Sequence, residues 1–465
     1  MSRKLRVCLV IEGSYPYITG GVSAWVQDIL EGLSDLEFAL LTISPSADQP
    51  LRYQLPPNVV EHRDIVITQR SSADSVSKEQ AKQLPAEILR LHRQFFHGES
   101  PEMSRLFSLL PEGISLHREA VDQKVFWDFL VRTSQERNPI YPFSDYYWAW
   151  QSSHELLFRV LAAVPPEADL YHAVSTGFAG VAALAAQIRH QKPFVLTEHG
   201  LYHKEREIEI RKAAYVHGYQ RDMWIKFYSS VSTLCYRGAD AVTALFEENR
   251  QKQLELGASQ DRSFVIPNGI DVERFSSVKR QPRSGRHVGL VGRIVPIKDV
   301  KTFIAAAKII AEEMPDITFY AIGPTDEDPE YYQDCLALAE SLSLGDRLQF
   351  TGRQNVLDFY AFLDVVVLTS VREAQPLVIL EAWAAGIPCV STKVGNVPEM
   401  LDYDERFLAS SKDPSQIASA LRFVLNHPEE MSLINQRNAE KVRRLYNRTD
   451  LLDKYRQIYR FVRGE

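Results

Sequence analysis

The chain has 465 residues, of which 45% are hydrophobic and 24% are charged, and its formal net charge is −7 with a pI of about 6.0. A chain of this length is too long to fold around a single hydrophobic core, so two or three domains are expected. The acidic balance argues against nucleic acid as the main partner, whereas an acidic small ligand needs only a local basic site. The four cysteines form no C-x-x-C pair, and Cys8 and Cys389 lie in apolar runs, which indicates buried thiols in a reducing cytosol.

The N-terminal apolar run resembles a secretion signal only at first sight. It ends at Glu12 without a small-residue cleavage site, and it is better interpreted as a first buried strand. No stretch approaches the roughly 18 apolar residues that a membrane span requires. We therefore expect a cytoplasmic protein, and peripheral attachment to a membrane stays open.

Strand and helix patterns alternate in the first part of the chain, predicting a parallel α/β domain. In chain order they are strand 5–11, helix 22–33, strand 37–44, strand 169–174, helix 179–189 and strand 193–197. Residues 46–168 break this rhythm, and we interpret them as an insertion in a first domain that spans 1–276. Their aromatic run at 141–150 favours a core or a protein contact, and stacking on the face of a sugar is the alternative.

A polar and basic linker at 277–286 separates a second domain, 277–448. Its predicted elements, in chain order, are strand 287–292, helix 300–314, strand 317–322, helix 331–342, strand 348–351, helix 357–363, strand 365–370, helix 376–386 and strand 387–392. Five strands alternating with helices predict a doubly wound parallel sheet. The last helix, 449–465, is a candidate to pack back on the first domain.

Two glutamates follow the strand at 365–370. Glu373 lies in the loop after the strand, and Glu381 lies eight positions later on the helix. In open α/β sheets, ligands bind outside the carboxyl ends of the strands. A carboxylate at that edge can accept hydrogen bonds from vicinal sugar hydroxyls, and the amides of residues 374–377, at a helix start, favour an oxygen or an anion. Chance placement of two solvated glutamates is the alternative.

Basic and small residues follow other strands in the same way. Arg293 ends the first strand of the second domain, and Lys298 comes just before the next helix, so the two could clamp a diphosphate. Gly20 and Gly21 open the first helix and permit close approach of another molecule. His199 follows the strand at 193–197 and is expected to point toward a ligand. Each of these sites has a non-functional alternative. Arg293 and Lys298 could be solvated cations, the two glycines could form a plain turn, and His199 could be a structural histidine.

Taken together, Gly20–Gly21, His199, the turn at 267–269, Gly292–Arg293 with Lys298, and Glu373 with Glu381 resemble the motifs of the retaining glycosyltransferases of family 4. The resemblance spans nearly the whole chain outside 46–168. It implies a GT-B fold, in which two Rossmann-like doubly wound parallel-sheet domains face each other across a cleft. The chain carries Gln375–Pro376 where many relatives have Gly-Phe, which leaves the identity of the sugar open.

The resemblance also implies roles for these residues. Arg293 and Lys298 would hold the diphosphate of a UDP-sugar, beside Gly20 and Gly21, and Glu381 would hold the ribose. The transferred sugar would be held by one carboxylate, one histidine and the amide segment: Glu373, His199, Ala374, Gln375, Pro376 and Leu377.

The expected reaction transfers a hexose or N-acetylhexosamine to a growing saccharide. A retaining hydrolase needs two carboxyl groups flanking the bond, and one glutamate here is committed to ribose, so front-face displacement is favoured. No cofactor and no metal are expected, because the acidic loop 326–328 lacks further ligands. An epimerase or hydrolase of the same fold, and a weakly active UDP-sugar-binding assembly subunit, are the alternatives. A dehydrogenase is disfavoured by the missing G-x-G-x-x-G fingerprint.

Overall fold

The computed structural model of the chain contains two compact units. Unit 1 comprises Met1–Ile266 and Lys454–Glu465, and unit 2 comprises Pro267–Asp453. The structure describes residues 3–67, 82–84, 86–90, 113, 124–137, 142–214, 216, 218–281 and 283–465. No helix within these ranges is long and apolar enough to span a bilayer.

Unit 1 is built on a parallel sheet of seven strands in the order β3-β2-β1-β4-β5-β6-β7. The strands are β1 (Arg6–Glu12), β2 (Glu37–Ser44), β3 (Val59–Val66), β4 (Leu170–Ala173), β5 (Phe194–Glu198), β6 (Ala241–Ala244) and β7 (Ser263–Val265). The central strands are apolar and buried along nearly their whole length, because helices cover both faces of such a sheet. Because the strands of this sheet are all parallel, their carboxyl ends lie at the same edge of the sheet.

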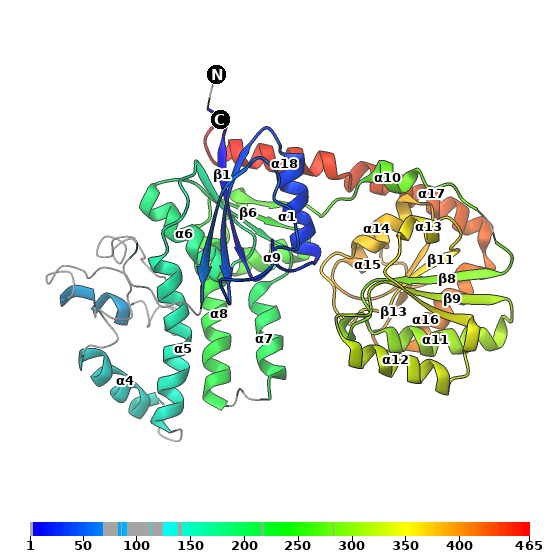
Figure 1. The fold of residues 1–465 in the computed structure, drawn as a ribbon, viewed down its shortest axis with the longest axis horizontal. Helices are drawn as coiled ribbons and strands as arrows, with labels where there is room; N and C mark the ends of the chain where they lie inside the picture. The colour runs from blue at the N-terminus through cyan, green and yellow to red at the C-terminus, as the bar shows by residue number, and fades with distance from the viewer. Residues whose placement is uncertain are drawn as a thin grey trace. The chain divides into compact units, whose positions relative to one another are not determined.

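The labelled helices of unit 1 are α1 (Gly21–Gly32), α4 (Lys124–Arg137), α5 (Phe143–Ala162), α6 (Phe178–His190), α7 (Tyr202–Lys212), α8 (Gly218–Gly238) and α9 (Glu247–Glu255). Three of them, α5, α7 and α8, pack together next to this edge. Helix α7 starts just after β5 and leads away from the sheet, packed against α8, which also contacts α5 (Figure 1). These helices thus extend the protein surface beyond the carboxyl edge of the sheet.

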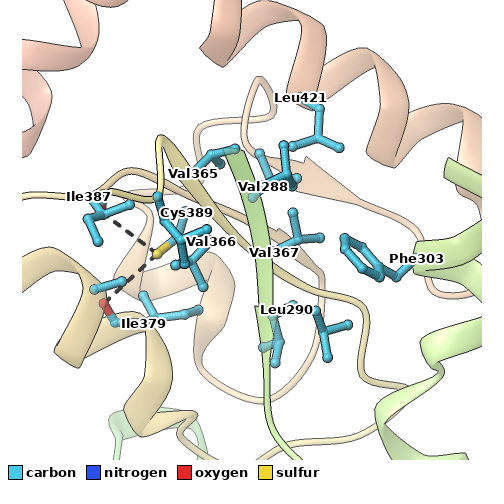
Figure 2. Packing of buried hydrophobic residues seen from close by; sticks show 14 of the residues in the cluster. Val288, Leu290, Phe303, Val365, Val366, Val367, Ile379, Ile387, Cys389 and Leu421 are labelled. Atoms are coloured by element: carbon cyan, nitrogen blue, oxygen red, sulfur yellow. Dashed lines mark hydrogen bonds between the residues drawn. The ribbon is translucent and has the colours of Figure 1, made fainter. Parts of the chain in front are cut away.

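Unit 2 has a parallel sheet of six strands in the order β10-β9-β8-β11-β12-β13. The strands are β8 (Arg286–Val291), β9 (Ile317–Ile322), β10 (Leu348–Gly352), β11 (Val365–Leu368), β12 (Cys389–Thr392) and β13 (Leu408–Ala409). Side chains of β11 alternate between the two faces. Figure 2 shows Val367 directed toward Phe303 and Val366 directed toward Cys389 and Ile379.

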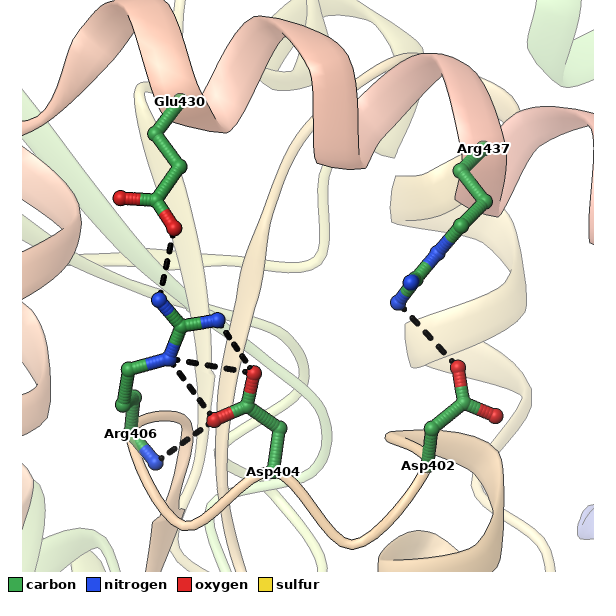
Figure 3. Close-up of polar contacts among 5 residues, drawn as sticks. All are labelled: Asp402, Asp404, Arg406, Glu430 and Arg437. Carbon is green, nitrogen blue, oxygen red and sulfur yellow. Dashed lines mark hydrogen bonds and ion pairs between the residues drawn. The ribbon is translucent and has the colours of Figure 1, made fainter.

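The helices of unit 2 are α10 (Val272–Ser276), α11 (Val300–Glu313), α12 (Pro329–Ser341), α13 (Val356–Tyr360), α14 (Leu377–Ala384), α15 (Val397–Met400), α16 (Pro414–Asn426) and α17 (Pro428–Leu445). Helix α17 is tied to the loop after α15 by ion pairs, which Figure 3 shows. Arg406 contacts Asp404 and Glu430, and Arg437 contacts Asp402. Such exposed pairs each contribute little, about 0–1 kcal/mol, so they orient the helix rather than hold it.

The last helix, α18 (Arg448–Phe461), begins in unit 2, and its residues from Lys454 onward belong to unit 1. There Tyr455 packs edge-on against Trp25 at 5.3 Å between ring centroids, and Arg456 bonds Asp35 at 2.7 Å. The C-terminal residues are therefore a structural part of the first unit.

The fold departs from the sequence expectations in three places. Residues 59–66, assigned to an insertion, form β3 at the edge of the sheet, and their mixed polar sequence hid this role because an edge strand is only half buried. Strands β6 and β13 were not predicted, and β13 has only two residues, too few for a periodic pattern, whereas a strand end just before the turn at 267–269 was expected and corresponds to β7. The polar segment 277–286 lies inside unit 2, whose first residue is Pro267. Much of the segment 46–168 falls outside the described residues.

Candidate functional site

The first part of the site lies where strands β8 and β9 of unit 2 end. Gly323, which follows β9, has φ +153°, and a Cβ there would lie 2.0 Å from the carbonyl oxygen of Gly292. Only glycine fits at 323, since real side chains do not approach a backbone oxygen so closely. Arg293 follows Gly292, and Lys298 ends the short 3-10 helix η3 (Pro296–Lys298) just before α11.

A lysine, a carboxylate and a hydroxyl meet at the carboxyl edge of this sheet. Lys298 Nζ lies 2.5 Å from Glu373 Oε1, and the two side chains are 19% and 17% exposed. Ser370 Oγ donates a hydrogen bond to the same carboxylate oxygen at 2.7 Å. The backbone of the lysine is fixed as well, because Thr369 Oγ1 donates to its carbonyl oxygen at 2.9 Å. The ends of β8 and β11 thus hold one positive and one negative charge in a partly shielded place, where salt screens them less.

Arg293, the second predicted cation, lies in a more open environment. Its Nη1 contacts Glu327 Oε2 at 2.7 Å, and these side chains are 44% and 34% exposed. A second residue of the acidic loop also has a local partner, because Asp328 accepts a hydrogen bond from the backbone N–H of Tyr331 and caps α12. Among the described residues no group of three or more His, Cys, Asp or Glu is placed to hold a metal ion.

The segment that leads into α14 supplies fewer amides than its length suggests. Pro376 is the N-cap of α14 and has no N–H, so the donors at this helix start are the amides of Leu377 and Val378. Gln375 is buried, and its Oε1 accepts a hydrogen bond from the backbone N–H of Asn268 at 2.7 Å. Its side chain therefore fixes the turn at 267–269 to this loop.

The other side of the same loop is fixed by a glycine. Gly395 has φ +52°, and a Cβ there would lie 2.3 Å from the carbonyl oxygens of both Glu373 and Ala374. The neighbouring amide of Asn396 donates to the oxygen of Ala374 at 3.0 Å. The loop that carries Glu373 is thus held by backbone contacts before any ligand is considered.

Glu381 has surroundings that differ from those of Glu373. It lies on α14, where the hydroxyl of Tyr360 on α13 donates to its Oε2 at 3.4 Å. Burial raises the pKa of Glu381, and the charge of Arg274 opposes this shift. The two glutamates predicted from sequence therefore have different partners: Glu373 contacts Lys298, and Glu381 contacts Tyr360.

In unit 1, Gly20 and Gly21 lie at the start of the helix whose Trp25 packs against His199. Gly21 is the first residue of α1 and Gly20 is its N-cap, with an extended φ of 172° that any residue adopts. A Cβ at either glycine would meet no atom within 4 Å, so nothing within the described protein requires glycine there. Trp25, one turn along α1, packs against the ring of His199 at 4.8 Å. The described contacts thus leave the surface above both glycines open to another molecule.

A carboxylate that the sequence reasoning did not select ends β1. Glu12 accepts a hydrogen bond from the hydroxyl of Tyr202 at 2.7 Å and one from the backbone N–H of Phe178 at 2.7 Å. A Cβ at Gly177 would lie 2.5 Å from the same carboxylate and 2.3 Å from the tyrosine ring. Glu12 therefore joins the start of α6 to the start of α7 at the carboxyl edge.

A second buried carboxylate, Glu198, lies beside His199. It accepts hydrogen bonds from the amide of Tyr202, from Gln253 Nε2 and from Thr176 Oγ1, each at 3.1 Å, and from the hydroxyl of Tyr236. Burial raises its pKa to about 7, and these donors oppose the shift. The sequence signal for Glu12 and Glu198 is weak: each is a charged residue that ends an apolar strand.

The fold of the whole chain has solved counterparts. HepE of Anabaena, in complex with UDP and glucose, has a TM-score of 0.61 and 16% identity over 98% of this chain and 99% of that one. Sucrose-phosphate synthase of Thermosynechococcus elongatus has a TM-score of 0.59 and 18% identity over 99% and 100% of the two chains. The expected fold class, two Rossmann-like parallel-sheet domains of the GT-B type, is confirmed.

The sequence defines the family. Residues 5–261, more than half of the chain, match the family described as Domain of unknown function (DUF3492), so the chain belongs to that family. Residues 285–427 match the family Glycosyl transferases group 1.

Similar curated proteins include a synthase and a galactosyltransferase. N-acetyl-alpha-D-glucosaminyl L-malate synthase of Bacillus anthracis is 29% identical over 46% of this chain and 55% of its own length. UDP-Gal:alpha-D-GlcNAc-diphosphoundecaprenol alpha-1,3-galactosyltransferase of Escherichia coli is 26% identical over 62% of this chain and 73% of its own. The chain spans about half the length of the first of these relatives.

Proposed function

We propose that this protein is a retaining glycosyltransferase that moves a hexose or N-acetylhexosamine from a UDP-sugar to a growing saccharide. The observation that carries the proposal is the contact of Lys298 with Glu373 beside the start of α14. A cation, an anion and free helix amides within one small region suit a ligand that has phosphate oxygens at one end and hydroxyl groups at the other.

The proposal assigns each part of the unit 2 site to one part of the donor. Lys298 and Arg293 bind the diphosphate, each leaving its present carboxylate partner, Glu373 or Glu327, when the phosphates arrive. Glu373 then becomes available to the hydroxyls of the transferred sugar. Glu381 binds the ribose. For unit 1 we propose that Gly20, Gly21 and His199 also serve the donor, as the family resemblance implies.

The chemistry we propose is a front-face displacement. The acceptor oxygen forms a bond to the anomeric carbon while the bond from that carbon to the phosphate oxygen breaks, and the departing phosphate takes the acceptor's proton. UDP and the extended saccharide are the products, so atoms and charge balance. Lys298 and Arg293 stabilise the negative charge that develops on the phosphate, and such preorganised groups usually supply the largest catalytic effect.

The acceptor side of the proposal rests on a closer resemblance. The long segment at 46–168 and the sequences at 197–202 and 289–299 are similar to PelF, the cytosolic glycosyltransferase of Pel exopolysaccharide synthesis. We propose exopolysaccharide of that type as the product, and peripheral association with an inner-membrane synthase complex as the setting. The similarity to a glucosaminyl malate synthase and to a galactosyltransferase supports a sugar-transfer role in general.

The experiment that tests this function is product analysis with a panel of UDP-sugars, with and without saccharide acceptors. The proposal predicts that UDP release depends on the acceptor and that the acceptor gains mass. UDP release at the same rate without any acceptor would indicate a hydrolase, and a changed sugar still attached to UDP would indicate an epimerase. Binding of UDP without turnover on any acceptor would favour an assembly subunit.

A further inference from the structure

A cavity of about 580 Å³ lies among α5, α7 and α8 of unit 1. Its volume falls within the range of small-ligand sites, roughly 300–1,000 Å³. The aromatic lining comprises Trp148, Trp224 and Tyr228, and the polar lining comprises Ser152, Arg206, Glu209 and Gln220. None of these residues takes part in the donor site proposed above.

The aromatic walls of the cavity offer flat faces to a ligand. Trp148 is 62% exposed, whereas its neighbours Tyr146 and Trp150 are buried in the core, so the aromatic run is divided between core and surface. On the facing helix, Trp224 and Tyr228 stack on each other with ring centroids 5.5 Å apart and an angle of 24° between planes. A large aromatic side chain kept in water at a cavity rim is the arrangement expected where a ring-shaped ligand stacks.

The charges of the lining indicate a neutral ligand. The only charged residues among the lining side chains are Arg206 and Glu209, and they pair with each other at 2.7 Å. The cavity therefore carries no net charge with which to attract a phosphate or an anionic lipid surface. It offers apolar faces together with planar hydrogen-bonding groups, which match the C–H faces and hydroxyl edges of a sugar ring.

The cavity is also connected to the carboxyl edge of the unit 1 sheet. The guanidinium of Arg206 lies over the ring of Tyr202 at 5.0 Å, and Tyr228 packs edge-on against the same ring at 5.7 Å. The hydroxyl of Tyr202 in turn bonds Glu12 at the end of β1. The cavity lining and the carboxyl edge are therefore joined by direct side-chain contacts through Tyr202.

We propose that this cavity is a binding site for a neutral oligosaccharide, the part of the growing acceptor behind its reacting end. The identification of the ligand as the acceptor rests on the proposed function, whereas the prediction of saccharide binding rests on the cavity alone. Trp148 provides the outer stacking face, and Trp224 with Tyr228 provides the inner one.

The test uses the full-length protein and short oligosaccharides of glucose, galactose and N-acetylglucosamine, titrated calorimetrically. We expect at least one series to bind more tightly as its chain lengthens, and Trp148→Ala to weaken that binding about tenfold, because the variant removes one aromatic stacking face. Trp148→Phe should restore part of the affinity. The matched control is Trp127→Ala on α4, because Trp127 is 51% exposed but does not line the cavity, and it should bind like the wild type.

The same titrations with UDP separate this inference from the proposed function. Trp148→Ala should bind UDP normally and unfold at the wild-type temperature. The cavity proposal would be overturned if the protein transfers sugar but binds no saccharide. It would also be overturned if Trp148→Ala binds saccharide as tightly as the wild type, or if Trp127→Ala weakens the binding equally. Saccharide binding that depends on Trp148 in a protein without transferase activity would support the cavity and reject the transferase.

Discussion

Replacing Lys298 by alanine should affect both catalysis and stability, and the structure sets the size of each effect. For catalysis, the variant loses one preorganised charge on the departing phosphate, and such a loss typically lowers turnover by about 10²–10³. For stability, it leaves the mostly buried carboxylate of Glu373 with Ser370 as its remaining polar contact. Truncating a fully buried pair costs about 3–5 kcal/mol and an exposed pair contributes about 0–1 kcal/mol, so we expect a loss near 2 kcal/mol.

Arg293→Ala is the matched control for this experiment. It also removes one cation and should lower turnover by a similar factor, yet its pair with Glu327 is far more exposed, so its stability should fall by less than about 1 kcal/mol. A double variant, Lys298→Met with Glu373→Gln, removes both charges of the partly buried pair and should regain most of the stability without regaining activity.

The assays are initial rates of acceptor-dependent UDP release and urea unfolding at fixed pH. Wild-type turnover in Lys298→Ala would mean that the diphosphate binds elsewhere. Equal destabilisation by Lys298→Ala and Arg293→Ala would refute the argument that the shielding of the Lys298 pair sets its contribution.

Three further predictions concern stability. Burial raises the pKa of Glu198 to about 7 from an ordinary value of 4.5, so between these pH values the native state keeps a proton that the unfolded state has lost, and stability falls as pH rises. The stability of Glu198→Gln relative to wild type should therefore improve by up to about 3 kcal/mol from pH 4.5 to 7 in thermal unfolding, and a difference that does not change with pH would contradict this. Gly395→Ala should destabilise unit 2 by more than the roughly 1–2 kcal/mol that a left-handed alanine costs, whereas Gly345→Ala, with φ +51° and open space around its Cβ, should cost only that amount in urea unfolding; equal losses would mean that the clash is relieved cheaply. Trp150→Ala should cost about 3–5 kcal/mol in the same assay, because Trp150 is buried in the core, and a loss below about 1 kcal/mol would count against its place there.

The buried parallel strands were predictable from sequence because a strand covered on both faces is a continuous apolar run. The segments at 287–292, 317–322 and 365–370 were located within a residue or two for this reason. Strand β3 was not predicted, because at the sheet edge its polar residues alternate irregularly and no period stands out. Strand β13 was not predicted either, because its two residues are too few to show a period.

The candidate site was predicted in part. Strand ends pointed to Lys298 and Glu373, but their contact at 2.5 Å joins positions far apart in sequence, and no spacing rule could supply it. The backbone amide of Gln375 stays a predicted contact to the sugar, whereas the hydrogen bond that its side chain accepts from Asn268 was not foreseen, because it joins positions far apart in sequence. Glu12 was passed over because a single charged residue after a strand is common, and its role emerges only from its contacts in three dimensions.

The central claim is that the two glutamates bind different parts of one UDP-sugar, and titration of UDP into Glu373→Ala and Glu381→Ala tests it most directly. Hydrogen bonds to a charged group contribute about 1.5–3 kcal/mol each, so losing two ribose contacts should weaken UDP binding by about 10²-fold or more in Glu381→Ala. Glu373→Ala should bind UDP almost normally and lose transfer, because the sugar is no longer held for reaction. Loss of UDP binding in Glu373→Ala together with normal binding in Glu381→Ala would contradict the account.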